Sequence, residues 1–333
     1  MNSRIAIFLG IMLLTLSAYM GVRGTANEVA SRLNTQYSKI LTEACRTATE
    51  RMEYDESGYA VMATKDVRES VIDAFFNTFL ISFEEATAKD GKIDSEPSIN
   101  RMILYKNIPV ILLMDVNGFY VWYNTFENDM LTSKMSSLTS YSKTISGSDI
   151  YYIRFFLGNR VQVSKKGEDI VYDGTPKEVY KKLGCPSELL FLSDYEKYAA
   201  YRNEYVADLV EDQVEYYINN ENLERQWTNS DRSDYVFEMP QISMSDWMEM
   251  VEYPSVISFY QGKQINNGSA VINTYAFSGS EFAPMKEYYI TDDKLYHKKE
   301  CGELTDEDRK QRSFSSRREL AAHGYSPCTK CRP

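Results

Sequence analysis

The chain has 333 residues, of which 43% are hydrophobic and 26% are charged, and these proportions are ordinary for a folded protein. Its formal net charge is −11, which argues against the basic surface that a nucleic-acid-binding protein needs, so we expect no nucleic-acid partner. Five cysteines in a chain of this length exclude a disulfide-built scaffold.

The N-terminus contains one long apolar segment. Residues 5–22 (IAIFLGIMLLTLSAYMGV) carry no charge and are long enough to cross the hydrocarbon core of a membrane as a helix. This length favours an uncleaved signal-anchor, with a cleaved signal peptide as the alternative. The large acidic domain that follows favours an orientation with the bulk of the chain outside the cytoplasm. The sequence therefore predicts a single-pass protein of the cell membrane, anchored through residues 5–22.

Two amphipathic helices are expected next. The 27 residues from Ala26 contain no Pro or Gly, so the anchor helix is expected to continue outward as a long helix. The second helix is predicted over residues 66–84, where apolar side chains recur every three or four positions and indicate a core-facing stripe. The stripe of the first helix comprises Val29, Leu33, Tyr37, Ile40, Leu41 and Ala44, and that of the second comprises Val67, Val71, Phe75, Phe79 and Phe83.

A β-hairpin is predicted from Ile108, in IPVILLMDVNGFYVWYNTF. Two apolar runs flank Asn117-Gly118, a pair that commonly supplies the positive-φ positions of a two-residue turn. Asp115 is expected to help form this turn. The segment resembles the strand–DxxG–strand hairpin of extracytoplasmic PAS-like (Cache) sensor domains, and this resemblance implies a ligand-binding sensor module as an alternative function.

The remainder of the domain alternates irregularly between strands and helices. Strands are expected at residues 151–156, 160–163, 169–172, 255–262, 269–279 and 287–290. Helices are expected from Thr175 to Gly184, over residues 193–224, and after Ser243. Since β and α segments do not alternate regularly, we expect an α+β fold with a mainly antiparallel sheet. Cys45 and Cys185 are expected to be small buried hydrophobic residues, with Cys185 in a turn.

The sequence contains no recognisable catalytic constellation. His297 and His323 are the only histidines, and the chain has neither a glycine-rich phosphate loop nor an HExxH motif. We therefore expect a protein that is not an enzyme. A secreted nuclease-like enzyme is the least favoured alternative.

The C-terminal tail gathers most of the metal-ligating residue types. His297 and Cys301 are separated by three residues, and Cys328 and Cys331 by two. Three thiolates and one imidazole at this spacing are typical of a closed, tetrahedral, structural Zn²⁺ site. The alternative is oxidation, in which Cys328 pairs with Cys331, and Cys301 with Cys45 or Cys185. This alternative leaves His297 and the odd number of cysteines unexplained.

The tail resembles a known module. Its pattern, His297-x3-Cys301 followed by GYSPCTKC, is similar to the zinc-binding knuckle at the ends of some secreted bacterial nucleases and surface proteins. It is also related in pattern to the metal-binding domain of the DNA-alkylation repair methyltransferase. Because His297 occupies the place of the first cysteine of that domain, the methyl-acceptor role is not implied here.

The whole chain resembles single-pass extracytoplasmic proteins of Gram-positive, clostridia-type bacteria whose genes lie beside those for Tad-like pili and type II-like secretion. The segments DAFFNTFLISF, PVILLMDVNGFYVWY, SDWMEMVEYPSVISFYQG and YYITDDKLYHKKEC carry this resemblance. It implies a non-enzymatic, membrane-anchored component of such an apparatus, with protein partners in the assembly. The expected organisation is a signal-anchor at residues 1–23, an extracytoplasmic α+β domain with a helical stalk at residues 24–290, and a zinc knuckle at residues 291–333.

Overall fold

The computed structural model describes most of the chain beyond the N-terminal segment. The described residues are 28, 31–54, 60–62, 64–88, 105–227, 236–263, 271–279, 286–291, 295–305, 307–310, 312–315, 320, 325–328 and 330–331. Within them, no helix combines the length and the hydropathy needed to span a membrane. The expected anchor at residues 5–22 lies outside the described residues.

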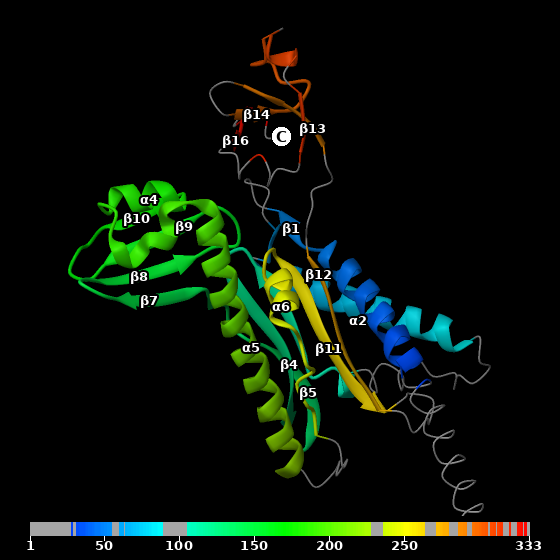
Figure 1. Cartoon of the computed structure of the whole chain (residues 1–333). Helices are drawn as coiled ribbons and strands as arrows, with labels where there is room; N and C mark the ends of the chain where they lie inside the picture. The colour runs from blue at the N-terminus through cyan, green and yellow to red at the C-terminus, as the bar shows by residue number, and fades with distance from the viewer. Residues whose placement is uncertain are drawn as a thin grey trace, which may run out of the picture.

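An antiparallel sheet, here called the central sheet, forms the middle layer of the molecule (Figure 1). Its strand order is β12-β11-β3-β4-β5, and the short strand β6 also pairs with β4. Its members are β3 (Val110–Asp115), β4 (Gly118–Glu127), β5 (Met130–Met135), β6 (Thr139–Ser140), β11 (Ser255–Lys263) and β12 (Val271–Gly279). A separate two-stranded ribbon pairs β1 (Glu53–Tyr54) with β2 (Ala60–Val61).

Both faces of the central sheet are covered at β3, which explains why this strand is apolar over residues 110–114 without a polar alternation. In β3, Val110, Leu112 and Met114 belong to one hydrophobic cluster, whereas Ile111 and Leu113 belong to the other. Because successive side chains of a strand point to opposite faces, a strand buried on both sides must be apolar throughout. The helices that make the two clusters lie on opposite sides of the sheet (Figure 1).

Two helices cover one face of the central sheet. Residues 31–49 form the first helix, and α2 (Lys65–Ala88) forms the second. The predicted stripes of both helices are buried as far as they are described, with Leu41, Phe75 and Phe79 fully inaccessible. The first helix therefore packs on its own domain over residues 31–49, and its apolar stripe is used there.

The other face is covered by α5 (Tyr195–Trp227) and α6 (Met244–Met250). At about 1.5 Å per residue, α5 is roughly 50 Å long and reaches beyond the central sheet. Its C-terminal half contacts β4, where the rings of Tyr123 and Tyr217 lie 4.4 Å apart between centroids. The short helix expected after Ser243 is confirmed, and Ser243 caps it, since its side chain accepts a hydrogen bond from the Asp246 N–H.

The N-terminal half of α5 packs on a second antiparallel sheet, here called the outer sheet, with strand order β10-β9-β8-β7 (Figure 1). It comprises β7 (Ser142–Ser146), β8 (Ile150–Phe155), β9 (Val161–Lys165) and β10 (Val171–Gly174). Phe155 of β8 contacts the rings of Tyr198, Tyr201 and Tyr205 on α5. The short helices α4 (Pro176–Lys182) and η1 (Ser187–Ser193) complete the packing. Helix α4 begins where the sequence predicts, and a capping box forms at Thr175.

The β3–β4 hairpin is confirmed, but the predicted reason for its glycine is wrong. The turn residues are Val116 and Asn117, and neither Asn117 nor Gly118 has a positive φ. Gly118 instead begins β4, where an added Cβ would lie 2.3 Å from the Thr139 carbonyl oxygen of β6. The glycine is thus required by the close approach of a second strand. Asp115 stabilises the turn as expected, because its Oδ1 accepts a hydrogen bond from the Asn117 N–H at 2.9 Å.

The turn that does use positive φ joins β4 to β5. Asn128 and Asp129 have φ values of 51° and 62°, which is the conformation of a two-residue type I′ turn. Asparagine and aspartate tolerate this region better than other non-glycine residues, so the turn needs no glycine.

The two isolated cysteines have different environments. Cys45 is fully buried, as predicted, and its thiol lies 3.6 Å from the Ala276 carbonyl oxygen. Cys185 is exposed, so the expectation that it is buried is wrong. It follows Gly184 at the end of α4, and Gly184 and Cys185 both have positive φ, at 79° and 60°.

The tail forms a third sheet, here called the tail sheet, with strand order β15-β13-β14-β16. It comprises β13 (Lys286–Ile290), β14 (Leu295–His297), β15 (Arg312–Ser315) and β16 (Ser326–Pro327), with the single turn η2 (Asp308–Lys310) beside it. Strand β13, which the expected domain boundary assigns to residues 24–290, thus pairs within the tail. The predicted antiparallel character holds for the described sheets except for the parallel pairing of β14 with β16.

Candidate metal centre

The first pair of candidate ligands lies at the end of β14. His297 is opposite Tyr289 of β13 and is buried. The chain then turns, and the Cys301 N–H donates a hydrogen bond to the Lys298 carbonyl oxygen at 3.0 Å. This turn places the Cys301 Sγ 3.3 Å from the Nδ1 of His297.

The second pair follows β16 and is fixed to the first pair by backbone hydrogen bonds. The parallel ladder pairs Tyr296 with Pro327, and the next N–H, that of Cys328, donates to the Tyr296 carbonyl oxygen at 3.0 Å. Three residues later, the Sγ of Cys331 accepts a hydrogen bond from the Lys298 N–H at 3.4 Å. The second pair therefore contacts the backbone that carries the first.

The four candidate ligand atoms converge on one point. One atom from each of His297, Cys301, Cys328 and Cys331 lies within 4.8 Å of the other three. A tetrahedral ion with metal–sulfur bonds of about 2.3 Å needs ligand atoms roughly 3.5 to 4 Å apart. The observed set is close to this size, and it could hold one metal ion after small side-chain adjustments.

The surroundings of the cluster suit ligation. The second ring nitrogen of His297, Nε2, lies 3.5 Å from the Thr291 hydroxyl, so Nδ1 is the nitrogen that faces the sulfurs. Outer partners of this kind orient a ligating imidazole. Arg309 donates hydrogen bonds to the carbonyl oxygens of Lys299 and Cys301, at 2.8 and 3.3 Å, and so fixes the turn between the first two ligands.

Burial and hydrogen bonds within the cluster shift the pKa values of the ligand thiols. Burial raises the pKa of Cys331 to about 11. Burial also acts to raise the pKa of Cys328, but backbone hydrogen bonds from Cys331 and Lys330 outweigh it, and this pKa is lowered. Hydrogen bonds with the neighbouring sulfurs of Cys301 and Cys328 raise the pKa of Cys331 further. A bound divalent ion would replace the thiol protons and stabilise all the thiolates together.

The structure brings together all four residues that the sequence singled out. Cys45 and Cys185 are not part of this cluster, and all five thiols are free rather than joined in disulfides. The other histidine, His323, lies outside the described residues. Sequence reasoning missed Thr291 and Arg309, because their contacts depend on the tail sheet and on a turn that spacing alone does not reveal.

Comparisons with known proteins add no relative. No family model, curated protein or solved structure matches this chain. The chain's own residues and their geometry are therefore the basis for assigning its function.

Proposed function

We propose that His297, Cys301, Cys328 and Cys331 bind one structural Zn²⁺, and that the chain is a non-enzymatic, membrane-anchored extracytoplasmic component of a Tad-like pilus or secretion apparatus. The observation that carries the metal assignment is the convergence of four ligand atoms within 4.8 Å. Three thiolates and an imidazole form a soft ligand set that selects Zn²⁺ over Mg²⁺ or Ca²⁺.

The ligand number supports a structural rather than a catalytic ion. Four protein ligands fill a tetrahedral shell and leave no position for a reactive water molecule. His297, Cys301 and Cys328 are each at most 4% exposed, so solvent has little access to the centre.

The packing of the tail gives the ion a physical role. On one side of the tail sheet, Tyr289 and Leu304 pack against the ligand cysteines, and on the other side Tyr288 packs with Tyr296 and Leu320. Among the described residues of the tail these clusters are small, and modules with so little apolar core commonly depend on a metal or disulfides. The ion would act as the core of the side that contains the ligands.

Metal content tests this assignment directly. The full chain, purified without chelator under reducing conditions, should contain one zinc per chain by elemental analysis. The double variant Cys328→Ser, Cys331→Ser should contain none, and Cys185→Ser is the matched control because that thiol is exposed and outside the cluster. Metal-free wild-type protein, or zinc retained by the double variant, would exclude the site.

The proposed placement at a membrane is supported by the uncharged residues 5–22 and by the helix at residues 31–49, which follows them closely and packs on the domain. Such an arrangement holds the domain near the bilayer surface. In its native host, the full chain should sediment with membranes and resist extraction by high-pH carbonate, and deletion of residues 5–22 should release it. Co-purification with the ATPase or the membrane platform of a Tad-like apparatus is expected. Recovery of the full chain in the soluble fraction would refute the anchor.

A further inference from the structure

One face of the outer sheet carries a regular array of polar side chains, here called the outer-sheet face. Its first row crosses the four strands as Ser142, Arg154, Gln162 and Asp173. Its second row crosses them as Thr144, Tyr152, Ser164 and Val171. The opposite face is apolar, with Tyr151, Ile153, Phe155, Val161 and Val163 buried against the helices.

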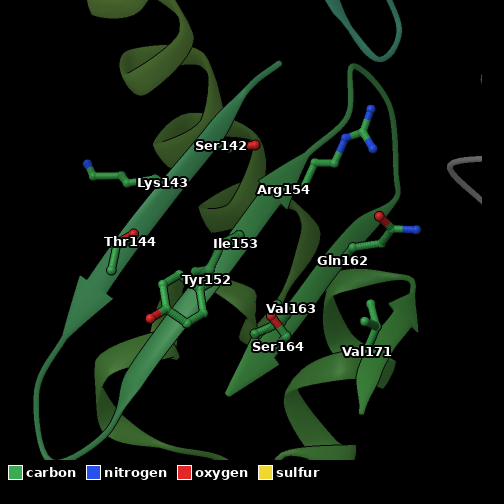
Figure 2. Close-up of a pocket in the computed structure, with 10 residues that line it drawn as sticks. All are labelled: Ser142, Lys143, Thr144, Tyr152, Ile153, Arg154, Gln162, Val163, Ser164 and Val171. Atoms are coloured by element: carbon green, nitrogen blue, oxygen red, sulfur yellow. The ribbon is translucent and has the colours of Figure 1, made fainter. Parts of the chain in front are cut away.

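A cavity of about 300 Å³ lies over the outer-sheet face, and Figure 2 shows the side chains around it. This volume is at the lower end of the range for small-molecule sites. All of the second row lines it, as do the first three members of the first row. The cavity is therefore lined by hydroxyl groups, one amide, one guanidinium and one aromatic ring, together with Lys143 and the aliphatic residues Ile153, Val163 and Val171.

Two cations, Lys143 and Arg154, belong to this lining. The Lys143 ammonium lies over the rings of Tyr201 and Tyr205, whereas Arg154 has no partner of opposite charge there. The Arg154 Nε is buried without a hydrogen-bond partner among the described residues, and its guanidinium lies 5.3 Å from the centre of the Phe156 ring. The nearest acid of the row, Asp173, already accepts hydrogen bonds from Arg160 at 2.9 and 2.6 Å and from Gln162 at 3.0 Å. These contacts, the Arg160 pair first, lower the pKa of Asp173 to about 2, so its charge is engaged elsewhere.

Together with Val171, Tyr152 gives the cavity its exposed apolar surface. The Tyr152 side chain is 48% exposed and lies between Thr144 and Ser164 (Figure 2). A half-exposed aromatic ring offers a flat surface, and the adjacent hydroxyls can donate and accept hydrogen bonds. Tyr152 and Arg154 are two residues apart on β8, which separates their backbones by about 6.6 Å. One six-membered ring with a charged substituent spans this distance.

We propose that the outer-sheet face binds a sugar that carries a carboxylate. The C–H face of the pyranose ring would stack on Tyr152, its hydroxyls would bond to Thr144, Ser164 and Gln162, and its carboxylate would pair with Arg154. A planar guanidinium is well suited to a carboxylate, because two parallel N–H groups can donate to its two oxygens. Ile153 and Val163 are buried, so only Tyr152 and Val171 offer exposed apolar surface, which is too little for a fatty acid.

The test is calorimetric titration of the full chain in a detergent without a sugar headgroup. The probes are glucuronate, as the unit of uronic-acid polymers, and N-acetylmuramate, as the acidic sugar of peptidoglycan. Glucose and acetate are the controls. We expect at least one acidic sugar to bind at concentrations up to about 10 mM, and about tenfold more weakly to Arg154→Gln or Tyr152→Ser. Which probe binds more tightly identifies the source of the carboxylate.

Matched variants separate the site from general effects. Arg46→Gln removes an exposed arginine from the first helix, and Tyr216→Ser removes a ring of similar exposure from α5. Both should bind like the wild type. Failure of both acidic sugars to bind, equal binding of glucose, or unchanged binding by Arg154→Gln and Tyr152→Ser would each overturn the proposal. Zinc content has no part in these outcomes, so they are independent of the metal assignment.

Discussion

Replacing Gly118 by alanine should destabilise the domain although the residue has no unusual φ. The added Cβ would lie 2.3 Å from the Thr139 carbonyl oxygen and 3.0 Å from the Thr139 carbonyl carbon, and these are backbone atoms that no rotamer change can move. Side-chain Cβ atoms essentially never approach closer than 3.0 Å, so β6 must shift by about 0.7 Å.

The loss of stability depends on the contacts of β6 and of Tyr141, the residue that follows it. Overpacking a rigid contact costs about 1–3 kcal/mol. Tyr141 follows β6 directly, is fully buried, and donates its hydroxyl to the carbonyl oxygens of Asp115 and Gly118 at 3.0 and 2.7 Å. Weakening this bifurcated bond adds about 1 kcal/mol. We expect Gly118→Ala to lower the free energy of unfolding by about 3 kcal/mol.

Urea unfolding followed by tryptophan fluorescence measures this change, because Trp122 and Trp247 are buried in different hydrophobic clusters. Gly302→Ala is the matched control, since a Cβ there meets nothing within 4 Å. A loss below about 1 kcal/mol for Gly118→Ala, or a loss equal to that of the control, would refute the reasoning.

Three further predictions concern other parts of the molecule. Burial raises the pKa of Glu221 to about 7, so the folded state retains a proton that the unfolded chain releases above about pH 4.5. The free energy of unfolding should therefore fall by up to about 3 kcal/mol as the pH rises from 5 to 8. Urea titrations at each pH measure this slope, and Glu221→Gln should flatten it. Arg202 is fully buried and donates hydrogen bonds to the Gly158 carbonyl oxygen at 2.7 Å and to the Asn203 Oδ1 at 2.7 and 3.0 Å. Arg202→Met leaves these acceptors without a donor and should lower the free energy of unfolding, measured in urea, by about 3–5 kcal/mol. Arg46→Met, at an exposed position, is the control, and an equally small effect of both variants would contradict this prediction. Removal of the proposed zinc by a chelator should accelerate hydrogen exchange at the Cys328 N–H and along β13 and β14, while the amides of β3 stay protected. Equal protection with and without chelator would show that the tail sheet does not depend on metal.

Much of the fold could be predicted where one element carries its own signal. Leu41 and Phe75 lie on stripes with helical spacing, and both are buried. Thr175 caps α4 because the capping box requires only residues within one turn. The metal-ligand residues are visible for the same reason, since each pair, such as Cys328 and Cys331, is close in sequence.

Features that depend on a second element could not be predicted in this way. Gly118 is required by a strand that follows about twenty residues later, and its Asn-Gly context suggested a turn position instead. Arg202 is a buried cation only because the loop around Gly158 turns its carbonyl groups inward. Cys185 is exposed within a pair of consecutive positive-φ residues, whereas its residue type suggested burial.

The outer-sheet face shows why register matters more than residue type for such a site. Tyr151 and Tyr152 are chemically identical neighbours, yet one is 3% exposed and buried among the helices and the other is 48% exposed beside Arg154. A shift of one residue in β8 would exchange them, because successive side chains point to opposite faces. The burial of Phe155 against α5 prevents this shift. Burial of the apolar side chains thus fixes the register of β8 and decides which residues lie on the outer-sheet face. The position of the candidate ligand site therefore depends on core packing on the other side of the same sheet.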